Sequence, residues 1–193
     1  MKVVLVNGSR RDNGCTYIAL MEVGEALKTE DIETQLIFVG KRVIAGEVDA
    51  AVDEVGEAMK DADGLVVGSP VYYASPTGEV QMVLDRLFMK YSREMLFKPA
   101  AAVTSARRAG ITATVNVLNE YFMMHQMPVV SSRYWNMVHG FTPEDVKKDL
   151  EGMQIMRMLG RNMAWLLKSI EAGKNAGVQT PAQEEVTMTN FIR

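Results

Sequence analysis

The chain has few of the features that mark several broad classes of protein. Its one cysteine, Cys15, leaves no internal disulfide framework and predicts no cysteine-bound metal cluster. A formal net charge of -3 gives no basic surface of the kind that nucleic acids need. No apolar run approaches the ~18 residues of a membrane span, and a strand-like run already begins at Val3, so we expect neither a membrane segment nor a secretory leader. These absences predict a cytoplasmic protein that binds neither nucleic acid nor membrane.

The composition of what remains is that of an ordinary soluble domain. The chain has 193 residues, of which 48% are hydrophobic and 23% charged, enough for one domain with a full core. We expect this domain to cover residues 1–172. Residues 173–193 are polar and interrupted by Gly, Ala and Pro, so they form either a disordered tail or an arm that lies on a neighbouring subunit.

Apolar runs alternate along the chain with segments of helical periodicity, which is typical of β-α-β architecture. Five strands connected by right-handed crossovers place helices on both faces of a parallel sheet. Two strand orders are common, the Rossmann order and 2-1-3-4-5, and the length favours the second. The predicted strands are 3–6, 35–39, 64–68, 100–104 and 129–130; the predicted helices are 15–28, 48–60, 80–91, 112–125 and one that begins after Thr142, with a loop at 40–47.

In such a sheet, ligands bind where the carboxyl ends of the strands meet at the switch in strand order. The loops that leave strands one, three and four should therefore converge. They cover residues 8–14, 69–77 and 105–110, and their compositions are the most unusual in the chain. We treat these three loops as the candidate site.

The first loop has the character of a phosphate site. Ser9, Arg11 and the Thr16 hydroxyl stand beside the N–H groups of residues 13–16, at the start of a helix whose dipole favours an anion. The loop matches neither a P-loop nor Gly-x-Gly-x-x-Gly, which disfavours a nucleoside triphosphate and a tightly bound pyrophosphate. A single phosphate monoester remains. The alternative is an ordinary turn with exposed arginines.

The second and third loops suit the rest of such a ligand. Residues 69–78 contain two prolines, two tyrosines and no charged residue, which makes a rigid aromatic setting for a flat heterocycle. The alternative is a packed surface loop. Residues 104–110 combine hydroxyl donors with Arg107 and Arg108 in front of another helix.

These motifs together resemble the NAD(P)H-dependent FMN reductase branch of the flavodoxin-like superfamily, nearest to the iron–sulfur flavoproteins and their cluster-free relatives. The resemblance covers about residues 1–172. It rests on Gly8, Ser9, Arg11, Gly14 and Thr16 in the first loop, on Ser69-Pro70-Val71-Tyr72 followed by Asp85-Arg86, and on Tyr134-Trp135-Asn136, His139-Gly140 and 160–165 downstream.

Two departures from the family pattern matter. Iron–sulfur members carry a compact cysteine motif where this chain has residues 40–53, which contain no cysteine, so we predict no iron–sulfur cluster. The family often has Asn where this chain has Cys15. A thiol at a helix N-terminus can have a lowered pKa and be reactive; the alternative that we favour is a small side chain packed against phosphate or backbone.

The resemblance implies a flavodoxin-like three-layer sandwich with an extra C-terminal helix, and bound FMN. Hydride from NAD(P)H would reach flavin N5, and the electrons would leave in a ping-pong scheme to a small acceptor such as a quinone, free flavin, an azo or nitro compound, or a metal. No catalytic side chain is assigned, and Trp135 and His139 are candidates on the substrate side, with Asn136 in the same capping loop. The implied cofactor-binding residues are Ser9, Arg11, Asn13, Gly14, Cys15, Thr16, Pro70, Val71, Tyr72, Tyr73, Thr104, Ser105, Arg107, Arg108 and Gly110.

Two rival functions remain at this point. One is a one-electron carrier of flavodoxin type, which the mild charge and the added helix disfavour. The other is a flavin redox sensor without turnover, with Cys15 as its reporter. The choice between NADH and NADPH is left open.

The last predicted helix carries more apolar residues than one sheet can cover. Thr142 and Pro143 start it, and Gly152 is a candidate break. We expect the excess to form a subunit interface in a homodimer or homotetramer. The predicted inward seam is Val146, Leu150, Met153, Met156, Gly160, Met163, Leu167 and Ile170, and the predicted surplus is Ile155, Met158, Leu159, Trp165 and Leu166.

Overall fold

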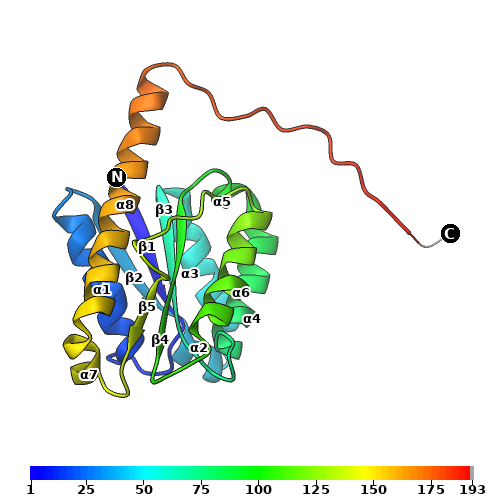
Figure 1. The fold of residues 1–193 in the computed structure, drawn as a ribbon. Helices are drawn as coiled ribbons and strands as arrows, with labels where there is room; N and C mark the ends of the chain where they lie inside the picture. The colour runs from blue at the N-terminus through cyan, green and yellow to red at the C-terminus, as the bar shows by residue number, and fades with distance from the viewer. Residues whose placement is uncertain (192–193) are drawn as a thin grey trace.

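A five-stranded parallel sheet forms the centre of the protein, and the computed structural model describes residues 1–191 (Figure 1). The strand order is β2-β1-β3-β4-β5, which confirms the predicted 2-1-3-4-5 arrangement. All four neighbouring pairs run parallel. The strands are β1 (Lys2–Asn7), β2 (Glu33–Phe38), β3 (Gly64–Pro70), β4 (Ala100–Ala106) and β5 (Met137–His139).

Helices cover both faces of this sheet, as the crossover rule requires. α1, α7 and α8 lie on one side, and α3, α4 and α6 lie on the other (Figure 1). The helices are α1 (Cys15–Lys28), α2 (Gly40–Ile44), α3 (Val48–Lys60), α4 (Gly78–Lys90), α5 (Ser92–Met95), α6 (Ile111–Met124), α7 (Pro143–Lys148) and α8 (Leu150–Asn175).

The alternation of side chains along β1 divides the core into two layers. Val4 and Val6 pack with α3, α4 and α6, whereas Val3 and Leu5 pack with α1 and α8. Because both faces are covered, the strand is apolar at successive positions. This is why its continuous apolar run predicted the central strand correctly.

α8 crosses α1 very closely. A Cβ on Gly160 would lie 2.7 Å from the Cβ of Ala26 and 2.8 Å from the carbonyl oxygen of Val23. Only a residue without a side chain allows this approach. Because the helices cross so closely, α8 also covers the apolar side chains on one face of β1, β3 and β4.

Two sequence predictions of secondary structure are wrong. The fifth strand is Met137–His139, not 129–130; Val129 makes only an isolated bridge with Ala100. The last strand is three residues long and pairs only with Thr104–Ala106, too short for a recognisable periodic pattern. Residues 40–47 were predicted as a loop, but Gly40–Ile44 form a one-turn helix, α2.

The end of the chain also differs from the prediction in detail. The helix breaks at Asp149 rather than at Gly152, because the Asp149 side chain accepts a hydrogen bond from the Gly152 N–H at 2.9 Å and so caps α8. Two of the five residues of the predicted apolar surplus, Ile155 and Leu159, are buried in the core, whereas Leu150, predicted to face inward, is 77% exposed. Trp165 does remain outside, 71% exposed.

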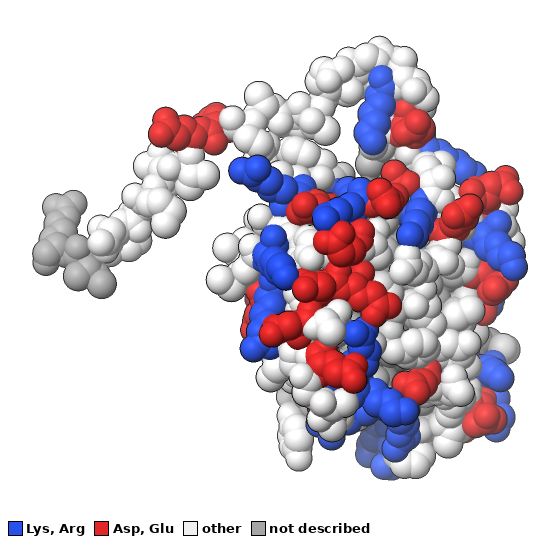
Figure 2. Space-filling view, turned by 180° about the vertical axis from the view of Figure 1, so that it is seen from behind, with Lys and Arg blue, Asp and Glu red and all other residues white. Residues whose placement is uncertain are grey.

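The surface is mixed in charge. Figure 2 shows Lys and Arg interspersed with Asp and Glu over the face opposite to that of Figure 1. Within residues 1–191, no helix combines the length and the apolar character needed to cross a membrane. The division of the chain at residue 172 stays a prediction; α8 itself continues to Asn175.

Candidate functional site

The three predicted loops meet at the carboxyl ends of β1, β3 and β4, and each is bonded to the others. The Thr77 hydroxyl donates to the Gly8 carbonyl at 2.9 Å, which ties the second loop to the first. The Val71 N–H donates to the Ser105 carbonyl, also at 2.9 Å, which ties the second to the third. The hydroxyls of Thr16 and Ser105 lie 2.9 Å apart and close the ring. The loops therefore form one structural unit.

Within the first loop, side chains take up the backbone groups of the turn. Asn7 Oδ1 accepts from the Ser9 N–H at 2.9 Å, and Ser9 Oγ accepts from the Arg11 N–H at 3.1 Å. Gly14 caps α1 without any side-chain hydrogen bond, so the first N–H groups of the helix stay available to a ligand. Among the described residues the buried Nδ2 of Asn7 has no hydrogen-bond partner. Buried donors seldom remain unpaired, so this end of β1 can accept a polar ligand atom.

The two neighbouring arginines of this loop have different surroundings. Arg10 forms an ion pair with the nearly buried carboxylate of Glu79 at 2.5 Å, and its guanidinium lies 6.0 Å from the ring centre of Tyr72. Arg11 is exposed, and no ion pair is formed with it among residues 1–191. Arg10 is thus engaged in holding the loops together, while the Arg11 charge is free to meet an anion. Asn13 is exposed beside it.

The second loop is a tight hairpin. Tyr72 and Ser75 exchange backbone hydrogen bonds of 2.9 and 3.0 Å. Tyr73 and Ala74, the two residues between them, have φ of 51° and 58°. Turns of this geometry usually contain Asn or Gly, and a strained backbone of this kind often marks a functional position. The hairpin holds the fully exposed Tyr73 ring at its tip.

The third loop packs directly against this hairpin. Gly110 has φ of +92°, and a Cβ there would lie 2.9 Å from both the Ala74 Cα and a methyl carbon of Val71. Arg107 and Arg108 are exposed on the turn that precedes it. Thr104, by contrast, is buried, and its N–H donates to the Asn136 carbonyl at 3.0 Å. The structure therefore places the arginines, and not Thr104, on the open side of the loop.

Cys15 is half-buried at the start of α1. Its Sγ lies 3.7 Å from the Gly140 carbonyl oxygen, to which the thiol donates. Burial raises the pKa of the thiol, and the nearby Asp145 carboxylate adds to this, against the opposing effects of a backbone hydrogen bond and Arg11. The thiol therefore stays protonated near neutral pH. This agrees with a packed small side chain rather than with a lowered pKa.

The two substrate-side candidates lie at different depths along the sheet edge. His139 ends β5 level with Ala106, and its backbone N–H donates to Asp149 Oδ2 at 2.6 Å. Trp135 comes before β5 and packs edge-on against Tyr134, at 4.6 Å between ring centres, facing α6. Only His139 is therefore brought to the same end of the sheet as the three loops.

Some features of the site were not predicted. A hollow of about 490 Å³ lies between the hairpin and α2, lined by Val43, Ile44, Tyr72, Tyr73 and Met82 among others. Glu79 and Thr77 were also missed, although Thr77 stands three residues before Val80, the first buried apolar residue of α4, a spacing typical of an N-cap. Asn7 was missed as well, although it is the polar residue that ends an apolar run, which is a comparable sequence signal of a site residue.

Comparison with known proteins identifies the family. Residues 1–142 match the family described as NADPH-dependent FMN reductase. The chain belongs to this family. It is therefore a flavin-dependent oxidoreductase, and the resemblance recognised from its loops is confirmed.

Individual relatives extend this picture. An iron–sulfur flavoprotein of Methanocaldococcus jannaschii is 30% identical over 196 residues, covering 89% of this chain and 100% of the relative. An FMN-dependent NADPH-azoreductase of Staphylococcus aureus is 30% identical over 103 residues, 47% of this chain and 54% of the relative. The solved structure of a WrbA-like flavodoxin from Agrobacterium tumefaciens superposes with a TM-score of 0.66 at 17% identity, covering 87% of this chain and 98% of the other. At that identity the structural likeness supports the flavodoxin-like fold alone.

Proposed function

We propose that this enzyme holds FMN on the three bonded loops and passes electrons from NAD(P)H to a small acceptor. The observation that carries the proposal is the closed set of hydrogen bonds among the loops around the uncapped N-terminus of α1. A phosphate fits this helix end, because the free N–H groups and the helix dipole both favour an anion. The unpartnered Asn7 amide nearby adds a donor to the same end of the sheet.

Each part of the ligand has a matching part of the chain. Arg11 and the N–H groups at the start of α1 suit the phosphate, and the exposed tyrosines of the hairpin suit the flat ring system. Arg107 and Arg108 add positive charge on the third loop. The proposed set is the one predicted from sequence without the buried Thr104: Ser9, Arg11, Asn13, Gly14, Cys15, Thr16, Pro70, Val71, Tyr72, Tyr73, Ser105, Arg107, Arg108 and Gly110.

Bound FMN supplies the hydride and electron transfer chemistry, and the chain supplies binding, orientation and charge. The Tyr73 ring stands clear of the body, so the ligand face beside it is open to solvent and to substrates. One open face can admit the nicotinamide donor and the acceptor in turn, which favours a ping-pong order. His139 lies near enough to the loops to contact a substrate from the edge of the sheet, and Trp135 could do so only toward a neighbouring subunit.

We further propose that the enzyme works without an iron–sulfur cluster, although relatives carry that name. Such clusters are held by several thiolates, and this chain has one cysteine. That cysteine donates to the Gly140 carbonyl. We also propose a homodimer or homotetramer, on the ground that Trp165 and Leu150 are exposed on α8, and a place in the cytoplasm, where NAD(P)H is abundant.

Continuous oxidation of NAD(P)H distinguishes the proposed enzyme from an electron carrier or a redox sensor. The FMN-loaded protein should oxidise NADH or NADPH continuously when a quinone is added, and double-reciprocal plots at several quinone concentrations should be parallel. A carrier or sensor would give a single stoichiometric reduction with no steady consumption. Intersecting lines would contradict the ping-pong order while leaving the oxidoreductase assignment intact.

The role of Arg11 can be tested by substitution. Arg11→Ala removes a charge-assisted contact worth about 1.5–3 kcal/mol, so FMN should bind about 10- to 150-fold more weakly. Arg93→Ala is the matched control, because Arg93 is an exposed arginine on α5, at the other end of β4. Fluorescence titration of apoprotein with FMN measures both. Equal affinities in the two variants would remove Arg11 from the phosphate site.

A further inference from the structure

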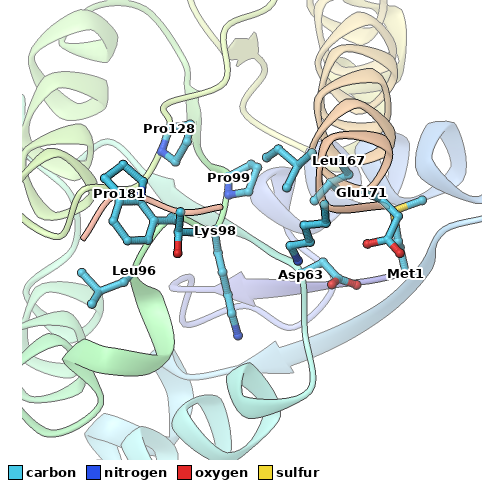
Figure 3. A pocket seen from close by; sticks show the side chains of 13 residues that line it. Met1, Asp63, Leu96, Lys98, Pro99, Pro128, Leu167, Glu171 and Pro181 are labelled. Carbon is cyan, nitrogen blue, oxygen red and sulfur yellow. The ribbon is translucent and has the colours of Figure 1, made fainter. Parts of the chain in front are cut away.

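The C-terminal arm, defined as residues 184–191, follows a segment that touches its own subunit. Residues 178–183 cross the end of the sheet opposite to the three loops (Figure 1). There Thr180 and Pro181 help to line a hollow of about 320 Å³, with Pro99, Pro128 and Leu167 across from Pro181 (Figure 3).

A hydrogen bond of 2.7 Å from Gln126 to the Gln183 side chain ends this anchored part. Beyond it the arm runs past the end of α6 and away from the body (Figure 1).

The arm carries large apolar side chains that its own subunit does not cover. Val186 is 78% exposed, Met188 86% and Phe191 91%. Val186 and Met188 are separated by Thr187, the period-two pattern of a strand with one apolar side. An extended segment of this kind is suited to lie along a groove or sheet edge.

The same chain has an uncovered apolar surface, which we call the edge face. It is formed by two hollows, of about 320 and 300 Å³, on either side of the segment that precedes β5. Val129, Val130 and Ser131 belong to both hollows. Trp135, 53% exposed, lines the first, and Trp165, 71% exposed, lines the second.

One charge beside the edge face is opposite in sign to the start of the arm. The arm begins with Glu184 and Glu185, which Figure 2 shows as the acidic pair on the extended tail. Arg133 in the first hollow is already paired with Glu151 at 3.3 Å, whereas the exposed Arg161 stands one turn before Trp165 on α8. The Arg161 charge beside the second hollow would attract the acidic start of an incoming arm and so set its direction.

We propose that the arm of one subunit docks on the edge face of a second copy of this chain. The anchor at Gln183 directs each arm away from its own body, and eight extended residues reach about 26–29 Å, enough to pass to a neighbour. Reciprocal exchange would bury both apolar surfaces in each subunit, as a two-fold assembly requires. The arm is remote from the three loops, so this assembly is independent of the bound cofactor.

The two tryptophans of the chain, Trp135 and Trp165, both lie on the edge face and report on its occupation. The test compares the full chain with a chain that ends at Gln183, which keeps the anchor. Light scattering gives the mass, tryptophan emission gives the state of the face, and flavin content checks folding. We expect the shorter chain to form a smaller species with red-shifted emission and unchanged FMN content.

A synthetic peptide of residues 184–191 should shift the emission of the shortened protein back. Unchanged mass and emission on truncation would overturn the proposal. A monomeric full chain whose emission still depends on the arm would also overturn it, because the arm would then cover its own subunit.

A pair of variants keeps the arm at full length. Val186→Ser with Met188→Ser should reproduce the effect of truncation, because it removes the apolar side of the arm. Thr187→Ser with Thr189→Ser alters the intervening positions and should leave mass and emission unchanged. If the two double variants behave alike, the apolar side of the arm is not the docking element.

Discussion

Gly110 is the position where the proposed site should be most sensitive to a single methyl group. Its φ of +92° lies in the left-handed region, and a Cβ would lie 2.9 Å from Ala74 Cα and from a methyl carbon of Val71. Gly110→Ala therefore has two costs. The backbone strain is about 1–2 kcal/mol, and forcing a methyl group into packed surroundings adds about 1–3 kcal/mol.

Gly46 offers a matched control for the first of these costs. It has φ of +83°, but a Cβ there would meet nothing within 4 Å. Gly46→Ala should therefore lower the free energy of unfolding by about 1–2 kcal/mol, whereas Gly110→Ala should lower it by about 2–5 kcal/mol. Denaturant unfolding of the two variants measures the difference, which belongs to the contact between the second and third loops.

The same pair tests whether the two loops act as one ligand site. The added methyl group must push the hairpin away from Gly110, so FMN should bind at least about 10-fold more weakly, or about 1.4 kcal/mol. Gly46→Ala should bind FMN as the unaltered protein does. Equal FMN affinity in both variants, with equal losses of stability, would refute the view that the loops form a single cradle.

Two further predictions concern parts of the fold away from the ligand. Thr142→Ala removes one half of the capping box of α7 and should lower the free energy of unfolding by about 1 kcal/mol, measured by denaturant unfolding; an unchanged midpoint would contradict it. Burial, together with hydrogen bonds to Asp53 and Glu57, raises the pKa of Tyr91 from 10.0 to about 12. The folded-state pKa is above the unfolded one, so this stabilisation is complete below pH 10 and is lost as the pH rises through about 12. In Tyr91→Phe the free energy of unfolding should therefore vary less with pH over that range. An unaltered pH dependence would exclude Tyr91 as the titrating group.

The fold follows from the sequence wherever a pattern is long enough to be periodic. α1 and α3 have the predicted bounds, because their apolar positions repeat over more than three turns. β5 was missed because three residues show no period, and Val129-Val130 resembled a strand more strongly. α2 was missed because a helix of one turn depends on its neighbours rather than on its own composition.

The candidate site was located from loop composition, but its internal roles were not. Loop composition alone does not distinguish Arg10 from Arg11. The family resemblance selected Arg11, and the position of Glu79 on α4 gives the physical reason, because it engages Arg10 and not Arg11. The turn at Tyr73 and Ala74 has positive φ angles but contains no glycine, so the sequence does not indicate its strained backbone. Such features depend on contacts between distant segments, which no local pattern records.

The most direct test of the central proposal is cofactor retention followed by reduction. The purified protein is incubated with FMN, desalted, and then mixed without oxygen with NADH and with NADPH while the flavin absorbance is followed. We predict a yellow protein with about one FMN per chain, bleached by at least one of the two nucleotides. A protein that is colourless after desalting, or whose bound flavin neither nucleotide bleaches, would contradict the proposed function.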